Sequence, residues 1–137
     1  MSIALDLTSF SKAVQRLAEG AVRYQGDTDD SQIRDGLVQR FEFTYEISHK
    51  ILKRYLEFAS PTPDAFDAMA FPDLIRTANE QGLLLGNWPA WKRYREMRSK
   101  TSHTYDEVIA LEVVAGIPAF LEETRFLLQQ LQGRCAE

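Results

Sequence analysis

Apolar residues recur every three or four positions through most of the chain, which is the spacing of amphipathic helices. The first such stretch runs from Leu7 to Tyr24, with Asp6 placed to cap its beginning and Gly26 placed to end it. The second runs without interruption from Ser31 to about Phe58. A helix of about 28 residues would be roughly 42 Å long, so its broad apolar stripe needs other helices or a second subunit to cover it.

The rest of the chain also follows a helical pattern. An Asp29-x-x-Gln32 capping box introduces the long helix, and two prolines separate that helix from a short helical turn that reaches Met69. The remaining helices are predicted at Phe71 to about Gly82, at Trp88 (after the cap residue Asn87) to about Lys100, and at Tyr105 to about Leu131.

The sequence shows no strand pattern and no internal repeat. Its 137 residues are enough for one domain that buries roughly two-thirds of its unfolded surface. We therefore predict a single all-α domain over residues 1–137, with residues 132–137 as a frayed tail. The expected architecture is an antiparallel, four-helix-type up-and-down bundle with an extra short helix.

Composition narrows the classes of function. Hydrophobic residues make up 45% of the chain and charged residues 26%, as in ordinary globular proteins. The net charge of −4 argues against binding polyanions over the whole surface, so any nucleic-acid contact must be local. We expect no cofactor. No signal peptide and no membrane-spanning run is recognisable, which predicts a cytoplasmic protein without membrane contact.

Metal and thiol chemistry find little support in the sequence. His49 and His103 stand 54 positions apart and no cysteine cluster accompanies them, so no zinc signature is present. The single cysteine, Cys135, excludes an internal disulfide and lies in the expected tail. We therefore expect no metal site.

One short stretch, from Arg98 to Tyr105, concentrates the candidate chemistry. On an uninterrupted helix with ~100° per residue, His103 would lie about 140° from Arg98 and face away from it. The hydroxyl-bearing residues between them are poor choices for a helix interior, and Thr104-x-x-Glu107 is a capping box that predicts a new helix beginning at Tyr105. The sequence thus predicts a corner between two helices where Arg98, His103 and Tyr105 converge.

The helix before this corner is the basic element of the chain. Only Glu96 opposes its cations, which are Lys92, Arg93, Arg95, Arg98 and Lys100. A run of charge is usually just a solvated face, but this one leads directly into the turn with His103, so positive potential would accumulate where an anion could react. We predict that Arg95, Lys100, Lys92 and Arg93 bind phosphate or RNA.

The pattern Arg98-x-x-x-x-His103-x-Tyr105 resembles the signature of the HEPN superfamily. Within it, Ser102 to Asp106 and a second patch, Arg34 to Glu46, are similar to the HepT-like nucleotidyltransferase substrate-binding proteins. The resemblance extends from about residue 5 to 132, with Ser99 where Asn or another polar acceptor is usual. It implies a dimeric HEPN-like bundle, a minimal nucleotidyltransferase encoded nearby as partner, and adenylylation of Tyr105 by that partner.

These residue types could cleave RNA without a metal. The imidazole of His103 suits proton transfer near neutral pH, and Arg98 presents a fork that matches two phosphate oxygens. One histidine cannot be base and acid at the same instant, but a symmetric homodimer would supply a second His103. Paired motifs at a dimer interface are what the resemblance to HEPN ribonucleases implies. AMP on Tyr105 would exclude RNA by its charge and bulk.

Three functions remain open from the sequence. The first is an endoribonuclease toxin in a toxin–antitoxin pair, silenced by modification of Tyr105. The second is a non-catalytic subunit that binds nucleotide substrate for a separate nucleotidyltransferase, which Ser99 favours. The third is a purely structural dimer, in which Arg98 complements a helix dipole and His103 forms a hydrogen bond in a turn.

His49 admits two interpretations. It lies on the long helix beside Lys50, Lys53 and Arg54. It is either a surface histidine on a basic face, the commoner case, or a second catalytic or phosphate-binding group.

Overall fold

The structure, a computed structural model, describes residues 5–135. Five α-helices lie in that range: α1 (Thr8–Gln25), α2 (Ser31–Phe58), α3 (Phe71–Glu80), α4 (Trp88–Lys100) and α5 (Glu107–Cys135). Two 3-10 turns accompany them: η1 (Pro63–Phe66) precedes α3, and η2 (Thr101–His103) precedes α5. The predicted all-α class is confirmed, and residues 5–135 contain no strand.

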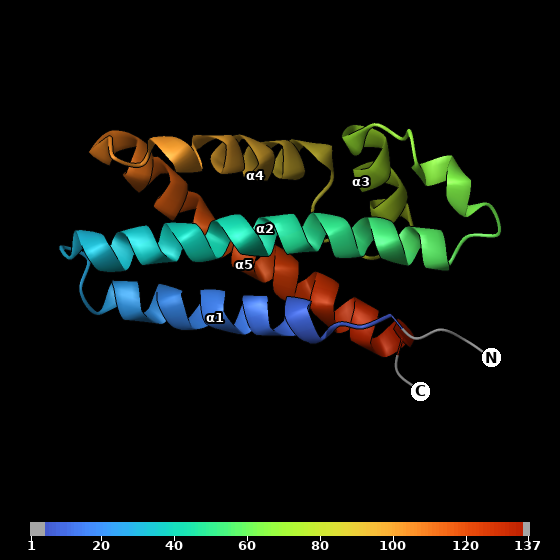
Figure 1. The fold of residues 1–137 in the computed structure, drawn as a ribbon, viewed down its shortest axis with the longest axis horizontal. Helices are drawn as coiled ribbons and strands as arrows, with labels where there is room; N and C mark the ends of the chain where they lie inside the picture. The colour runs from blue at the N-terminus through green and yellow to red at the C-terminus, as the bar shows by residue number, and fades with distance from the viewer. Residues whose placement is uncertain (1–4, 136–137) are drawn as a thin grey trace.

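The long helix α2 is the centre of the bundle (Figure 1). α1 packs antiparallel along one side of it, while α4 and α3 lie on the other side, near opposite ends. α5 runs obliquely behind α2 and contacts α1, α2 and α4. Four longer helices and the short α3 form the predicted four-helix-type bundle with an extra short helix.

An aromatic cluster fixes α2, α4 and α5 relative to one another. The fully buried Trp91 meets the rings of Tyr94 and Phe120 edge-on, with centroids 5.4 and 6.2 Å away. Phe41 of α2 meets Phe120 of α5 at 4.9 Å, and Tyr45 lies 6.4 Å from Trp91. Such pairs contribute about 0.5–1.5 kcal/mol each beyond area burial, so the helices that carry the candidate site rest on a rigid support.

Helix beginnings follow the predictions in part. Asn87 caps α4 as predicted, and its side chain accepts the N–H of Trp88 at 2.9 Å. α1 begins at Thr8 with Leu7 as its N-cap and not Asp6, although Asp6 accepts the N–H of Thr8 at 2.9 Å. The cap of α2 is Asp30 and not Asp29, because the side chain of Asp30 accepts the N–H groups two and three residues further on. The backbone of Asp30 is extended (φ −84°, ψ 108°), which is the geometry that an N-cap requires.

A buried carboxylate fixes the loop between α3 and α4. Glu123 of α5 is 2% exposed, and its two oxygens accept the backbone N–H groups of Leu85 at 2.7 Å and Gly86 at 2.8 Å. Burial raises the pKa of Glu123, and the two backbone donors oppose that change. The loop is therefore held in place to present the first turn of α4.

The last helix is longer than predicted. We expected α5 to end near Leu131 and residues 132–137 to fray, but the helix continues to Cys135. Arg134 donates a hydrogen bond to the carbonyl of Gln81 at 2.5 Å, and Cys135 packs against the core, so the last turn is anchored. Ala136 and Glu137 lie outside the described residues.

Candidate functional site at the corner of α4 and α5

Side-chain hydroxyls close the corner between α4 and α5. The hydroxyl of Thr101 donates to the carbonyl of Arg98 at 2.8 Å, and the hydroxyl of Thr104 donates to the carbonyl of Thr101 at 3.2 Å. Carbonyls at a helix end lack helical partners, so these bonds favour ending α4 in the turn η2. His103 therefore lies in the turn, as predicted.

The beginning of α5 was predicted wrongly. The capping box placed it at Tyr105, but the first helical residue is Glu107 and the cap is Asp106. The carboxylate of Asp106 accepts the N–H groups two and three residues further on, at 2.9 and 3.4 Å. A carboxylate is a stronger acceptor than the hydroxyl of Thr104 at the positive end of a helix. Tyr105 consequently lies outside the helix and is 87% exposed.

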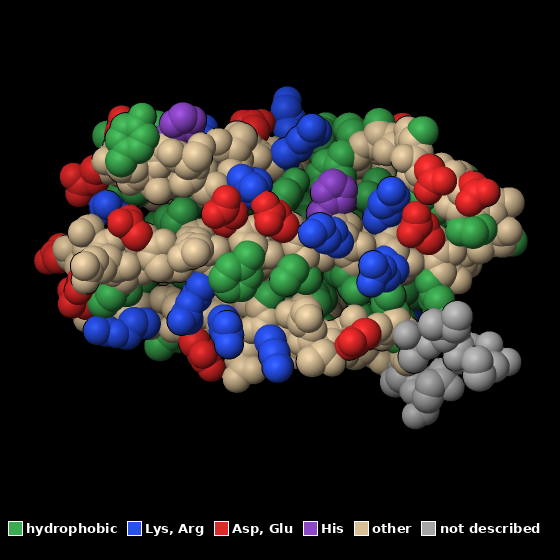
Figure 2. All heavy atoms as spheres, in the orientation of Figure 1, with side chains coloured by type: hydrophobic (Ala, Val, Ile, Leu, Met, Phe, Trp, Pro, Cys, Tyr) green, Lys and Arg blue, Asp and Glu red, His purple; other side chains and the backbone are tan. Residues whose placement is uncertain are grey.

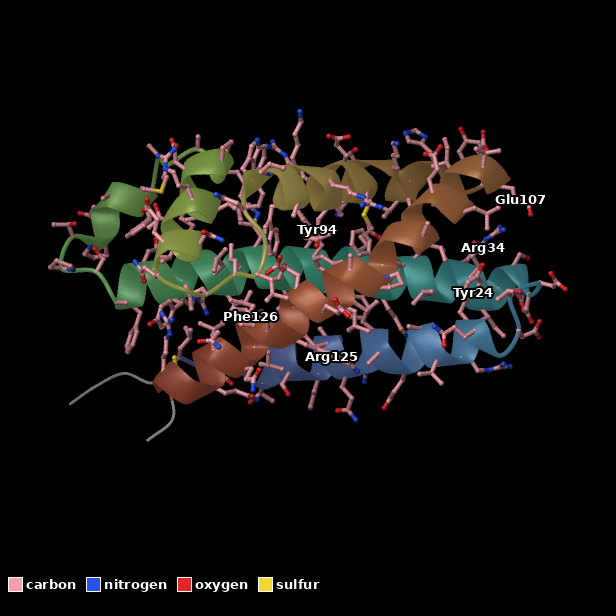
Figure 3. The ribbon with its side chains drawn as sticks, turned by 180° about the vertical axis from the view of Figure 1, so that it is seen from behind. Tyr24, Arg34, Tyr94, Glu107, Arg125 and Phe126 are labelled. Carbon is pink, nitrogen blue, oxygen red and sulfur yellow. The ribbon has the colours of Figure 1, made fainter. Side chains whose placement is uncertain are left out.

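Arg34 of α2 ties the beginning of α5 to the bundle. Its side chain is 13% exposed, and its Nη1 lies 3.7 Å from Oε1 of Glu107. Figure 3 shows both residues at the same end of the molecule, where α2 and α5 begin. The contact helps to hold the corner against α2.

The guanidinium of Arg98 reaches α2. Its Nη2 lies 2.5 Å from Oε1 of Glu46, its Nη1 lies 3.3 Å from Oε2 of Glu42, and it also donates to the hydroxyl of Thr101 at 3.3 Å. The hydrogen bond to Glu46 raises the pKa of Arg98, with burial opposing it. Carboxylate oxygens therefore occupy the fork that we predicted for phosphate oxygens.

Sequence reasoning missed Glu42 and Glu46. They stand four residues apart and so share one face of α2, and both lie in the patch Arg34 to Glu46. That spacing is a recognisable signal, but the pairing of Glu46 with Arg98 joins residues 52 positions apart. Periodicity in one helix cannot predict such a pair.

His103 and Tyr105 lie side by side on the surface. Their ring centroids are 6.2 Å apart at an interplanar angle of 68°, and both side chains are exposed. Among residues 5–135, no hydrogen bond or ion pair joins Arg98 to His103. The three residues share one corner, but only the two rings are in direct proximity.

The four cations predicted to bind phosphate do not lie at one place on the surface. Arg95 lines one hollow together with Arg98, and its Cζ lies 5.7 Å from the centroid of the Phe71 ring. Arg93 and Lys100 line another hollow of about 320 Å³, where Nζ of Lys100 lies 3.3 Å from Glu112. Lys92 is exposed and lines neither.

His49 is half-buried, which differs from the surface histidine that the commoner interpretation predicted. Its ring centroid lies 4.3 Å from that of Phe71. Burial lowers the pKa of His49, and the nearby charges of Arg95 and Lys53 lower it further. The basic surroundings were predicted correctly, but the packing against α3 was not. Figure 2 shows both imidazoles of the chain on one face, with acidic and basic side chains between them.

Residues 5–135 contain no group of three or more His, Cys, Asp or Glu side chains arranged to hold a metal ion. No helix in the same range is long and apolar enough to cross a membrane.

The sequence is similar to known proteins over nearly its whole length. The sequence model of the family described as "Nucleotidyltransferase substrate binding protein like" matches residues 5–133. A Haemophilus influenzae protein named "Probable ribonuclease HepT" is 39% identical over 130 residues, which cover 92% of this chain and 88% of the relative.

Solved structures agree with these matches. A Haemophilus influenzae structure, described as revealing the fold of a substrate-binding domain of a nucleotidyltransferase, has a TM-score of 0.86 at 37% identity and covers 93% of this chain and 99% of its own. A Thermus thermophilus crystal structure has a TM-score of 0.63 at 29% identity, with the same coverage. The chain therefore belongs to the nucleotidyltransferase substrate-binding-like family, as the resemblance in its sequence implied.

Proposed function

We propose that the chain is a metal-independent endoribonuclease, the toxin of a toxin–antitoxin pair, which a minimal nucleotidyltransferase silences by adenylylating Tyr105. The observation that carries the proposal is the exposed pair of His103 and Tyr105, with ring centroids 6.2 Å apart, in the turn that follows Arg98. The phenol that would accept AMP and the imidazole that would transfer a proton thus lie at the same exposed corner. The name of the ribonuclease relative supports the same activity.

Cleavage would proceed by transfer within the RNA chain. One imidazole takes the proton of a ribose 2′-hydroxyl, and the 2′-oxygen forms a bond to the adjacent phosphorus. The bond from phosphorus to the 5′-oxygen breaks, and a protonated group gives its proton to that oxygen. The products are a 2′,3′-cyclic phosphate and a 5′-hydroxyl end. Arg98 stabilises the negative charge that develops on the phosphate oxygens.

The second proton-transfer group would come from a second copy of the chain. Large apolar side chains are exposed beside the corner: Tyr105 (87%), Val108 (67%) and Leu111 (47%). Such a cluster is typical of an interaction surface, and a two-fold axis there would place two copies of His103 in one cleft. The exposed apolar residues support a homodimer through the beginning of α5.

Adenylylation would act directly on this cleft. The phenol oxygen of Tyr105 attacks the α-phosphorus of ATP, the phenol proton is lost, and pyrophosphate leaves. The exposure of Tyr105 supports access by a partner enzyme. AMP attached there would bring a negative charge and a bulky group beside His103, and both would exclude RNA.

The proposal is tested by incubating the purified chain with its minimal nucleotidyltransferase and ATP, and then measuring intact mass and RNA cleavage. We expect wild type to gain AMP and to lose cleavage. Tyr105→Phe should stay unmodified and remain active, while the control Tyr24→Phe, which changes a tyrosine on α1 (Figure 3), should behave like wild type. A mass gain in Tyr105→Phe, or undiminished cleavage by the modified protein, would contradict the proposal.

The alternative function is a non-catalytic subunit that binds nucleotide substrate for a separate nucleotidyltransferase. The family description favours it, and so do Ser99 and the carboxylates that occupy Arg98. It predicts a stable complex with the nucleotidyltransferase, nucleotide binding that Arg98→Ala abolishes, and no cleavage of RNA by any preparation.

A further inference from the structure

A hollow of about 410 Å³ opens between α2, α3 and α4. Its lining comprises Tyr45, Glu46 and His49 from α2, Phe71 from α3, and Arg95, Arg98 and Ser99 from α4. The volume lies within the range of about 300–1,000 Å³ that is usual for small-ligand sites. The guanidinium of Arg95, the imidazole of His49 and the hydroxyl of Tyr45 offer hydrogen-bond donors there. Arg98 is already paired with Glu46 and Glu42, and the hydroxyl of Ser99 donates to the carbonyl of Glu96 at 2.7 Å.

Phe71 holds two of these donors in place. Its ring centroid lies 4.3 Å from that of His49, and Cζ of Arg95 lies 5.7 Å from the same ring. Trp88 and Trp91 pack edge-on against Phe71, at 5.8 and 6.4 Å between centroids. A ring fixed in this way orients both donors before a ligand arrives, which reduces the entropy that binding costs.

The charges around His49 sum to a positive environment. From α2 the groups that face it are Tyr45, Glu46 and Lys53, and from α4 they are Arg95 and Arg98, while α3 lines the hollow with Phe71 alone. Glu46 and Glu42 already offset Arg98. Arg95 makes no salt bridge within residues 5–135. Burial lowers the pKa of His49, and Arg95 and Lys53 lower it further, so the imidazole lies in a positive potential.

We propose that this hollow is a phosphate-binding subsite, in which Arg95 and His49 hold a phosphate group of a nucleotide or of RNA next to Arg98. The inference rests on the proposed function, because it shares Arg98. It adds His49 to that site and selects Arg95 from the four predicted phosphate-binding cations. A bound phosphate would replace the repulsion that His49 experiences with attraction. Its binding would therefore raise the pKa of His49, and the affinity would increase as the pH falls through the range in which His49 titrates.

Histidine NMR tests this directly. The Cε1–H signals of His49 and His103 are assigned with His49→Gln and His103→Gln, and inorganic phosphate, AMP or a 2′-deoxy dinucleotide that cannot be cleaved is then titrated into wild type. We expect saturable shifts of the His49 signal and a raised pKa of His49 in the presence of the dinucleotide, whose charge is constant in this pH range. A response to phosphate and AMP would indicate a nucleotide as ligand, and a response only to the dinucleotide would indicate the RNA backbone.

Substitutions assign the donors. Arg95→Gln should weaken binding about tenfold or more, as expected for the loss of a hydrogen bond to a charged group. The matched control Arg125→Gln removes an exposed arginine of α5, labelled in the view from behind (Figure 3), and should leave binding unchanged. An unresponsive His49 signal, or an affinity that Arg95→Gln leaves intact, would overturn the subsite.

Cleavage assays separate this inference from the proposed function. If His103→Ala abolishes cleavage while His49→Gln and Arg95→Gln change neither KM nor binding, the subsite is wrong and the nuclease stands. If His49 responds to the probes but wild type cleaves no RNA, the subsite stands and the nuclease is wrong.

Discussion

The guanidinium of Arg98 forms ion pairs with two carboxylates of α2. Glu46 lies at 2.5 Å and Glu42 at 3.3 Å from its guanidinium nitrogens. Both pairs are partly exposed, so each contributes modestly to stability. Their larger effect is on binding, since a phosphate group must compete with two anions for the same fork.

Glu46→Gln should therefore tighten the binding of AMP. The change removes one competing charge and leaves an amide of similar size, so we expect an affinity about three- to tenfold higher, equivalent to about 0.7–1.4 kcal/mol. Calorimetric titration measures the effect. Glu80→Gln is the matched control, because it removes the same charge from the exposed end of α3. An affinity that is equal in the two variants would mean that Glu46 does not compete.

Glu123 should make stability depend on pH. Burial raises its pKa above the ordinary 4.5, so the folded state binds this proton more tightly than the unfolded state does. The stability gained from protonating Glu123 is fully present below about pH 4.5, and it is lost as the pH rises through the pKa of the folded state. Urea unfolding of wild type and Glu123→Gln is measured between pH 4 and 7. The free energy of unfolding of wild type, relative to that of Glu123→Gln, should fall as the pH rises. A difference that stays constant across this range would contradict the account.

At the level of residues, the sequence predicted what is local. The Arg98, His103 and Tyr105 motif lies within eight positions, and the turn that gathers it follows from the hydroxyls around it. Glu46 and His49 acquire their roles from contacts with α4 and α3, far away in the chain. The apolar periodicity of a single helix cannot predict contacts with another helix.

At the level of elements, helix existence was easier to predict than helix ends. The apolar period is repeated over many residues, and α2 was predicted with both ends correct. Ends depend on which of two neighbouring polar residues adopts the extended cap geometry. Asp30 displaced Asp29 for that reason, whereas Asp106 displaced Thr104 because its carboxylate accepts the first N–H groups of α5.

The loop before α4 should tolerate no side chain at Gly86. A Cβ there would lie 2.7 Å from Cβ of Ala90 and 2.9 Å from Oε1 of Glu123. The first of these belongs to the helix itself and cannot rotate away, so we expect Gly86→Ala to cost about 1–3 kcal/mol of stability. Denaturant unfolding measures the cost.

Gly133→Ala is the control for this prediction. Within residues 5–135, no atom beyond its chain neighbours and the backbone of its own helix lies within 4 Å of a Cβ at that position in α5, so the change should be neutral or stabilise by up to about 1 kcal/mol. Equal effects of the two substitutions would show that crowding at Gly86 is not limiting.

At the level of the whole molecule, the apolar residues beside the corner should mediate the proposed homodimer. Leu111→Glu places a charge in this surface, and burying an unpaired charge is costly. We expect light scattering to show a mass shift from dimer to monomer, together with loss of RNA cleavage. Val22→Glu, an equally drastic change at an exposed position of α1, should stay dimeric and active. A Leu111→Glu protein that remains an active dimer would exclude this interface.

The central claim is that His103 transfers a proton during RNA cleavage. The most direct measurement compares wild type with His103→Ala on one RNA in excess EDTA, after intact mass has shown both preparations to be unmodified. We predict cleavage by wild type, with 2′,3′-cyclic phosphate ends, and a rate at least about a hundredfold lower for the variant. Equal rates, or no cleavage by unmodified wild type, would contradict the claim.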